Sequence, residues 1–92
     1  MDNPTSIKYK VFFSKQAIKS LQKIPKSYQI KVKDVVKKLE ENPFKLDLKK
    51  LLPPHNTSHR LRMGSYRLFL NIDTNPKEII IVDIVRRTSQ TY

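Results

Sequence analysis

The sequence predicts an α+β fold in the order β-α-α-β-β-β, with two N-terminal helices packed on one face of a mostly antiparallel four-stranded sheet. Two observations predict it. Apolar residues recur at helical spacing in the first half of the chain, and they alternate or run together in the second half. Helices that are segregated in sequence from the strands are typical of the α+β class. With 92 residues, we expect one domain over 1–92.

The first half of the chain predicts a strand followed by two helices. Alternating apolar residues in "IKYKVFF" indicate a half-buried strand over 7–13. Ser14 is the expected N-cap of a helix that ends at Pro25. Ser27 is expected to cap a second helix, which ends near Asn42 because the following proline disfavours helical backbone there. Helices joined by so short a link should form an antiparallel pair.

The second half of the chain predicts a hairpin and a last strand. Residues 46–58 carry little pattern, and their prolines mark a loop. Two alternating segments, "HRLRM" and "YRLFLNID", then flank the dipeptide Gly64-Ser65. Because Gly-X is the signature of a two-residue type II′ turn, these segments should form a β-hairpin. The apolar run "EIIIVDIV" predicts a central strand.

The charge of the chain points to a polyanionic partner. The formal net charge is +11, which opposes compaction through self-repulsion. A basic surface that only maintains solubility is the alternative. The sequence has no cysteine, which excludes disulfides, thiolate metal sites and a cysteine nucleophile, and which suits a reducing cytoplasm. No segment has the length and apolarity of a signal peptide or a transmembrane helix, so we expect a cytoplasmic protein without a membrane partner.

The predicted hairpin places like charges opposite each other. With Gly64-Ser65 as the turn, Arg62 faces Arg67 and Arg60 faces Phe69, all on the side away from the helices. Directly opposed like charges destabilise a sheet, and no acidic residue occurs from 48 to 72 to relieve them. A phosphate group fits this face, because arginine binds phosphate bidentately, and an unstacked base can lie on the aromatic ring. A solvated basic strand is the alternative.

Basic residues on either side of the hairpin extend the cluster. Arg86 and Arg87 stand where the last strand ends, and their side chains could converge on the same open face. A frayed C-terminal surface is the alternative. Lys49 and Lys50 precede the hairpin and are expected to contact RNA, whereas the helix lysines are expected to be solvated.

These residues permit RNA cleavage without a metal ion, by attack of the 2′-hydroxyl of the RNA on the adjacent phosphate. The reaction needs an oriented 2′-hydroxyl, stabilisation of the extra charge on phosphorus and protonation of the leaving 5′-oxygen. Clustered arginines can stabilise that charge. The 8 acidic residues form no paired-carboxylate motif, and His55 and His59 lack metal-ligand partners. We therefore expect neither a metal ion nor another cofactor, and His59 is expected to be a surface or packing residue.

The segments "FSKQAIKSLQKIP", "LEENP", "RLRMGSYRLFLNID" and "RRTSQTY" resemble the RelE/ParE superfamily of bacterial type II toxin–antitoxin toxins over nearly the whole chain. The resemblance implies the RelE-like form of the fold predicted above. The RelE branch implies a ribosome-dependent mRNA endonuclease, an mRNA interferase that inhibits translation by cleaving mRNA within the A site. The ParE branch implies a DNA gyrase inhibitor with a similar fold.

The resemblance also implies roles for individual residues. Arg67 resembles the family arginine that stabilises charge at the scissile phosphate, and Arg60 falls where the family often has a catalytic lysine. Arg86 resembles the C-terminal catalytic arginine, and Tyr92 resembles the tyrosine that stacks on or orients the substrate. Arg62 matches a further basic position on the same strand.

The sequence departs from the family pattern at two positions. Ser58 stands where some nuclease members carry another basic residue, and Arg60 stays protonated where a lysine could release its proton. The arginines and Tyr92 favour the RelE branch, with the gyrase inhibitor and a non-catalytic RNA-binding module as alternatives. The resemblance further implies a cognate antitoxin, small and acidic or partly disordered, that folds on binding.

Overall fold

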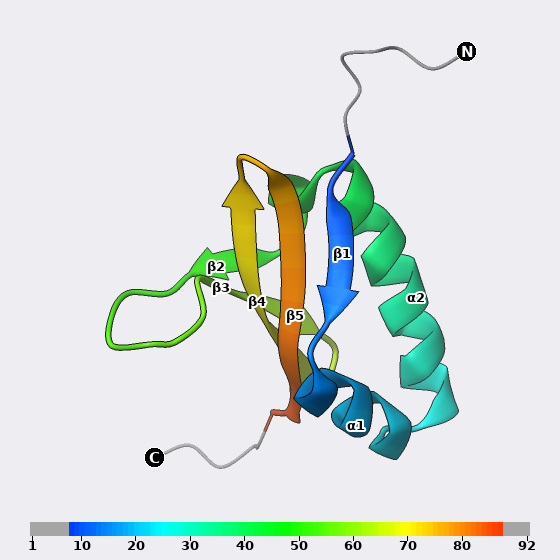
Figure 1. The fold of residues 1–92 in the computed structure, drawn as a ribbon. Coiled ribbons are helices and arrows are strands. Elements are labelled where there is room, and N and C mark those ends of the chain that lie inside the picture. Colours follow the sequence, from blue (N-terminus) through cyan, green and yellow to red (C-terminus); the bar gives the residue numbers. More distant parts are fainter. Residues whose placement is uncertain (1–7, 88–92) are drawn as a thin grey trace, which may run out of the picture.

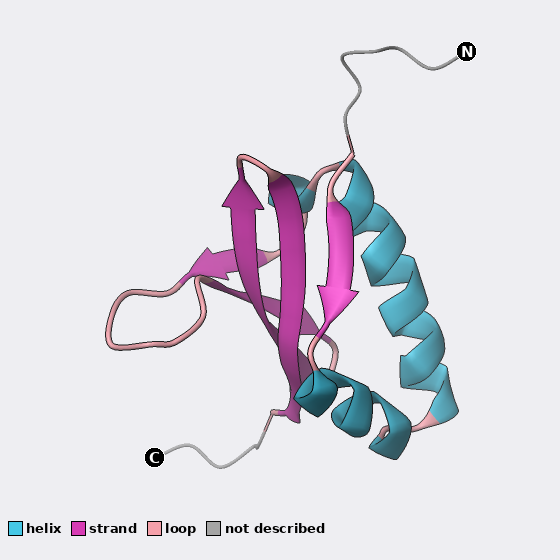
Figure 2. Cartoon of the chain, in the orientation of Figure 1, coloured by secondary structure: helices cyan, strands magenta, loops and turns pink. Residues whose placement is uncertain are grey.

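The computed structural model describes residues 8–87 and contains two helices on one side of a five-stranded sheet (Figures 1 and 2). The spatial order of the strands is β1-β5-β4-β3-β2, and only the β1–β5 pair is parallel. The predicted α+β fold is therefore confirmed. In chain order the elements are β1 (Lys10–Phe13), α1 (Lys15–Lys23), α2 (Lys26–Glu41), the 3₁₀-helix η1 (Pro43–Lys45), β2 (Leu48–Lys50), β3 (His59–Met63), β4 (Tyr66–Thr74) and β5 (Lys77–Arg86).

The predicted number of strands was wrong, because the sheet has five strands and not four. The additional strand is β2, which pairs antiparallel with β3 at the edge of the sheet. It has only three residues, too few to show an alternating pattern in the sequence. Its pairing moves Lys49 and Lys50 from the predicted loop into the sheet, beside the hairpin.

The starts of the two helices differ in their chemistry. The Ser14 side chain accepts a hydrogen bond from the Ala17 backbone N at 3.0 Å, so the predicted N-cap of α1 is confirmed. The predicted cap of α2 was wrong: α2 begins at Lys26, directly after Pro25, and has no side-chain cap. Pro25 has φ −58°, close to the value that its ring imposes, and this backbone leads directly into the first helical turn.

The two helices meet at an open angle (Figure 1), not as the antiparallel pair that the short link predicted. α1 lies across one end of β5, and α2 runs along β1. A groove of about 520 Å³ remains between them, lined by side chains that include Leu21, Val32 and Val36. Among residues 8–87, no helix is long and apolar enough to cross a membrane.

The core lies between the helices and one face of the sheet. Leu68, Leu70, Ile79 and Ile81 are fully buried on this face, and Leu39 of α2 covers them from the other side. Among residues 8–87, no helix covers the opposite face of the hairpin, so side chains on that face lie outside the core (Figure 2). The core therefore forces every second residue of β3 and β4 onto the open face.

Candidate functional site

The hairpin has the register that the sequence predicts. Arg62 pairs with Arg67, and Arg60 pairs with Phe69, across β3 and β4. Gly64 has φ +57°, a left-handed backbone conformation that side chains with a Cβ rarely adopt. A Cβ at Gly64 would also lie 2.6 Å from the Tyr28 Oη, so conformation and space both require glycine here.

Four arginines lie on the open face, and we call this set the arginine face: Arg60, Arg62, Arg67 and Arg87. Val85 pairs with Arg67 and therefore lies on the open face. Arg87 follows two residues later, and alternation along the strand places it on the same face. Within the described part of the chain, none of the four forms an ion pair. Their charges therefore meet no carboxylate at contact distance.

Three guanidinium groups of the arginine face are partly desolvated. The Nε atoms of Arg60, Arg67 and Arg87 are buried and have no hydrogen-bond partner among residues 8–87. Burial lowers the pKa of Arg60 from its usual value, and the charges of Arg67, Arg62 and Arg87 lower it further, while Asp47 opposes the shift. Arginine nevertheless remains protonated in proteins. The result is a group of fixed cations whose buried donors lack acceptors.

A hollow of about 440 Å³ lies beside the arginine face, between the hairpin and the loop that follows β2. Arg60, Arg67 and Phe69 form its floor together with Lys49, which pairs with Arg60. Lys50 pairs with His59, which in turn pairs with the buried Leu70, so the register assigns Lys50 to the helix side of the sheet. Lys50 nevertheless borders the hollow. Five of the residues predicted from the sequence therefore line one hollow: Lys49, Lys50, Arg60, Arg67 and Phe69.

His55 lines the same hollow, although no pattern in the sequence predicts a role for it. It lies in the loop between β2 and β3, where no periodic pattern indicates which way a side chain points. Only the composition of the loop, an imidazole between two basic strands, could have drawn attention to it.

The structure does not bring Arg86 to the arginine face. Arg86 pairs with Tyr66, which is buried on the helix side. A β-bulge in β5 explains this position: Leu70 pairs with Ile81 and Phe69 with Asp83, so Val82 is an extra residue that reverses the alternation beyond it. The other predicted C-terminal residue, Tyr92, lies outside the described residues.

The turn between β3 and β4 is held from two sides. On the helix side, the Ser65 backbone N donates a hydrogen bond to the Tyr28 Oη at 3.1 Å, and the Tyr28 ring lies edge-on to Tyr66 at 4.6 Å. On the other side, Arg87 donates from its backbone N to the Ser65 carbonyl at 2.6 Å and from Nη1 to the Gly64 carbonyl at 3.1 Å. The hydrogen bonds to Ser65 lower the pKa of Tyr28, with smaller contributions from Lys31 and Arg86. This turn therefore connects α2 to the arginine face.

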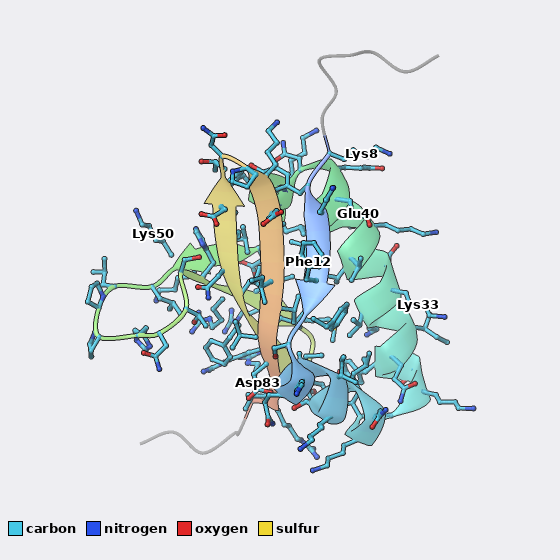
Figure 3. The ribbon with its side chains drawn as sticks, viewed as in Figure 1. Lys8, Phe12, Lys33, Glu40, Lys50 and Asp83 are labelled. Atoms are coloured by element: carbon cyan, nitrogen blue, oxygen red, sulfur yellow. The ribbon has the colours of Figure 1, made fainter. Side chains whose placement is uncertain are left out.

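Asp83 of β5 pairs with a residue of the open face, but its carboxylate bonds to α1 and not to the arginine face. Asp83 pairs with Phe69, yet its Oδ1 accepts hydrogen bonds from the Ser20 Oγ at 2.7 Å and from the Ile84 backbone N at 2.8 Å. Figure 3 shows Asp83 beside α1, which carries Ser20. Between residues 8 and 87, no group of three or more histidine, aspartate or glutamate side chains is arranged to hold a metal ion.

Solved structures with a similar fold include toxins and toxin–antitoxin complexes. A chain of the RelBE2 complex from Mycobacterium tuberculosis is 26% identical, with a TM-score of 0.78 over 88% of this chain and 100% of that chain. A chain of the archaeal RelE–RelB complex from Pyrococcus horikoshii OT3 is 29% identical, with a TM-score of 0.77 over 89% of this chain and 98% of that chain. The isolated RelE toxin of E. coli is 14% identical, with a TM-score of 0.70 over 89% of this chain and 87% of that chain, which shows the fold alone.

The sequence match establishes the protein family of this chain. The family model of the ParE toxin of the type II toxin–antitoxin system parDE matches residues 11–91, and the chain belongs to this family. It is a type II toxin with the RelE/ParE fold. No functionally curated protein matches the chain with significant similarity. The family model has a ParE name whereas the solved structures have RelE names, so family membership alone leaves the target open.

Proposed function

We propose that this toxin is a ribosome-dependent mRNA endonuclease that inhibits translation. The observation that carries the proposal is the arginine face, whose four guanidinium groups form no ion pair with any residue from 8 to 87. Phosphate oxygens accept hydrogen bonds from the terminal nitrogens of guanidinium groups and supply the missing negative charge. The aromatic ring of Phe69 beside Arg67 offers a surface on which an unstacked base can lie.

Cleavage uses the 2′-hydroxyl of the RNA as its nucleophile and needs no metal ion. The 2′-oxygen forms a bond to phosphorus, the bond to the 5′-oxygen breaks, and the products are a 2′,3′-cyclic phosphate and a 5′-hydroxyl. Arg60 and Arg67 stabilise the extra negative charge that develops on the phosphoryl oxygens. Because Arg60 keeps its proton, it acts through its charge and not as a general base.

The remaining basic residues hold the message. Lys49, Lys50 and Arg62 bind the RNA backbone on either side of the scissile phosphate. Arg87, tied to the turn by its two hydrogen bonds, takes the place on the arginine face that the family resemblance implied for Arg86. The roles of Arg86 and Tyr92 stay predictions.

The toxin acts with a cognate antitoxin, and the two relatives above come from toxin–antitoxin complexes. A partly disordered, acidic antitoxin suits this chain, because its exposed surface is basic and includes the apolar groove between α1 and α2. Lys33 and Lys37 at the rim of that groove complement acidic side chains. Both partners work in the cytoplasm, where ribosomes carry the substrate.

Gyrase inhibition is the second candidate, favoured by the ParE name of the matching family model. A translation reaction with purified toxin separates the two functions. We expect the mRNA to acquire new 5′ ends within translated codons, only when ribosomes are present. Intact mRNA together with broken, gyrase-bound DNA in a parallel gyrase reaction would instead establish the ParE activity. Ribosome binding without new ends would indicate a non-catalytic RNA-binding module.

A further inference from the structure

We propose that His55 is the general acid that protonates the leaving 5′-oxygen, an inference that rests on the proposed RNA cleavage. The arginine face explains how charge on phosphorus is stabilised, but not which group delivers a proton. His55 lines the hollow whose floor contains Arg60, Arg67 and Phe69.

The loop that carries His55 is held at its base. The Leu51 backbone N donates to the Ser58 carbonyl at 2.9 Å, which closes the loop directly beyond β2. Within the loop, the His55 backbone N donates to the Leu52 carbonyl at 3.3 Å and turns the chain back. These two bonds hold the backbone of the loop beside the hollow that His55 lines.

The other polar groups that line the hollow are poorly suited to proton transfer. Arg60 and Arg67 stay protonated, and Lys49 and Lys50 carry ammonium groups, which serve as compact point charges. Imidazole exchanges protons readily near neutral pH, which is the requirement for a general acid. Of the described residues that border the hollow, only His55 has such a group.

Two nearby carboxylates are also less suitable. Asp47 interacts electrostatically with Arg60 but does not line the hollow. Asp83 is occupied by its hydrogen bonds to Ser20 and Ile84.

The second histidine has a different environment and serves as a matched control. His59 pairs with the buried Leu70 and therefore faces the helix side of the sheet. Its Nδ1 lies 2.7 Å from the Ser58 Oγ, and its ring lies edge-on to Phe44 at 6.3 Å. An imidazole is thus present on each side of the sheet, but only His55 borders the arginine face.

The proposed step balances as follows. The 2′-oxygen attacks phosphorus and loses its proton to solvent water. As the bond between phosphorus and the 5′-oxygen breaks, its electron pair stays on that oxygen, which takes a proton from the imidazolium of His55. The neutral imidazole then regains a proton from water, so the enzyme returns to its starting state.

A message with sulfur in place of the bridging 5′-oxygen at the cut site tests this role, because a thiolate leaves without prior protonation. On ribosomes, His55→Ala should cleave the ordinary message about 10²–10⁴-fold more slowly than the unmodified toxin. The same variant should cleave the 5′-thio message close to the rate of the unmodified toxin. His59→Ala should leave both rates unchanged, and Arg67→Ala should slow both, because the charge on phosphorus develops in either reaction. Thermal melting checks that each variant is folded.

Two outcomes would overturn the role of His55 while leaving the proposed function intact. Cleavage of the ordinary message at full rate by His55→Ala would show that no proton comes from His55. Equal slowing of both messages would show that His55 binds or positions the RNA. If the unmodified toxin itself leaves both messages intact on ribosomes, the proposed nuclease function fails, whatever the behaviour of the variant.

Discussion

Replacing Arg67 by methionine should make the protein more stable and less active. Methionine keeps an unbranched, flexible side chain that can still cover the sheet. The change removes a buried Nε that has no hydrogen-bond partner, and it removes the charge that faces Arg62 across the hairpin. Arg67 also lowers the pKa of Arg60 through charge repulsion, so the substitution removes an unfavourable interaction with this second cation as well.

The gain in stability can be estimated from these two changes. A buried donor without an acceptor costs about 1–3 kcal/mol, and directly opposed like charges cost about 0.2–1 kcal/mol. We therefore expect Arg67→Met to raise the free energy of unfolding by about 1–4 kcal/mol, measured by urea denaturation. In a domain of this size each kcal/mol corresponds to a rise in Tm of about 4–8 °C. Added salt should shrink the electrostatic part of the gain.

Activity should change in the opposite direction. Loss of one preorganised group that stabilises transition-state charge typically slows catalysis about 10²–10³-fold, and we expect a similar loss of mRNA cleavage by Arg67→Met. The neighbouring Leu68→Ala is the control for stability, because Leu68 is 0% exposed and its truncation should cost about 2–5 kcal/mol. If Arg67→Met destabilises the protein as much as Leu68→Ala does, the arginine is structural and this reasoning is refuted.

Three further variants test the turn and the helix side of the sheet. Tyr28→Phe removes the acceptor of the Ser65 N–H and should lower the midpoint of urea denaturation slightly, because this hydrogen bond is exposed. Gly64→Ala should cost at least about 1–3 kcal/mol in the same measurement, because φ is +57° and the new Cβ would meet Tyr28. Burial lowers the pKa of His59, so the unfolded chain binds a proton at this residue more readily than the folded protein does. The stability that neutral His59 contributes is therefore fully present above about pH 6.5, and it is lost as the pH falls from there through the lower pKa of the folded state. His59→Gln should flatten that loss in denaturation curves recorded from pH 7.5 to 4.5, whereas an unchanged slope would assign the acid sensitivity to other groups.

The sequence predicted the hairpin well because local rules determine it. Gly64 sets the turn, the turn sets the register, and alternation then places Arg60, Arg62 and Arg67 on one face. Strand β2 could not be predicted, since its three residues take their conformation from pairing with β3. Ser27 was a plausible cap by residue type, but α2 begins at Lys26, directly after Pro25, which is two residues earlier than a cap at Ser27 allows.

The C-terminal part of the site shows where pattern reading fails. Regular alternation from Ile79 and Ile81 would place Arg86 on the open face. The bulge at Val82 shifts the pattern by one residue, so Ile84 is buried and Arg87 reaches the arginine face. No residue in "EIIIVDIV" signals a bulge, because all its apolar residues suit either face.

Cleavage of two matched messages on programmed ribosomes tests most directly whether the arginine face cuts RNA through the substrate's own 2′-hydroxyl. One message carries an ordinary nucleotide before the cut, and the other carries a 2′-deoxy sugar at that single position. We predict that the toxin cleaves the first message, leaving a 2′,3′-cyclic phosphate, and that it binds the second without cleaving it. Efficient cleavage of the 2′-deoxy message would contradict the mechanism, because the attacking oxygen would then have to come from water.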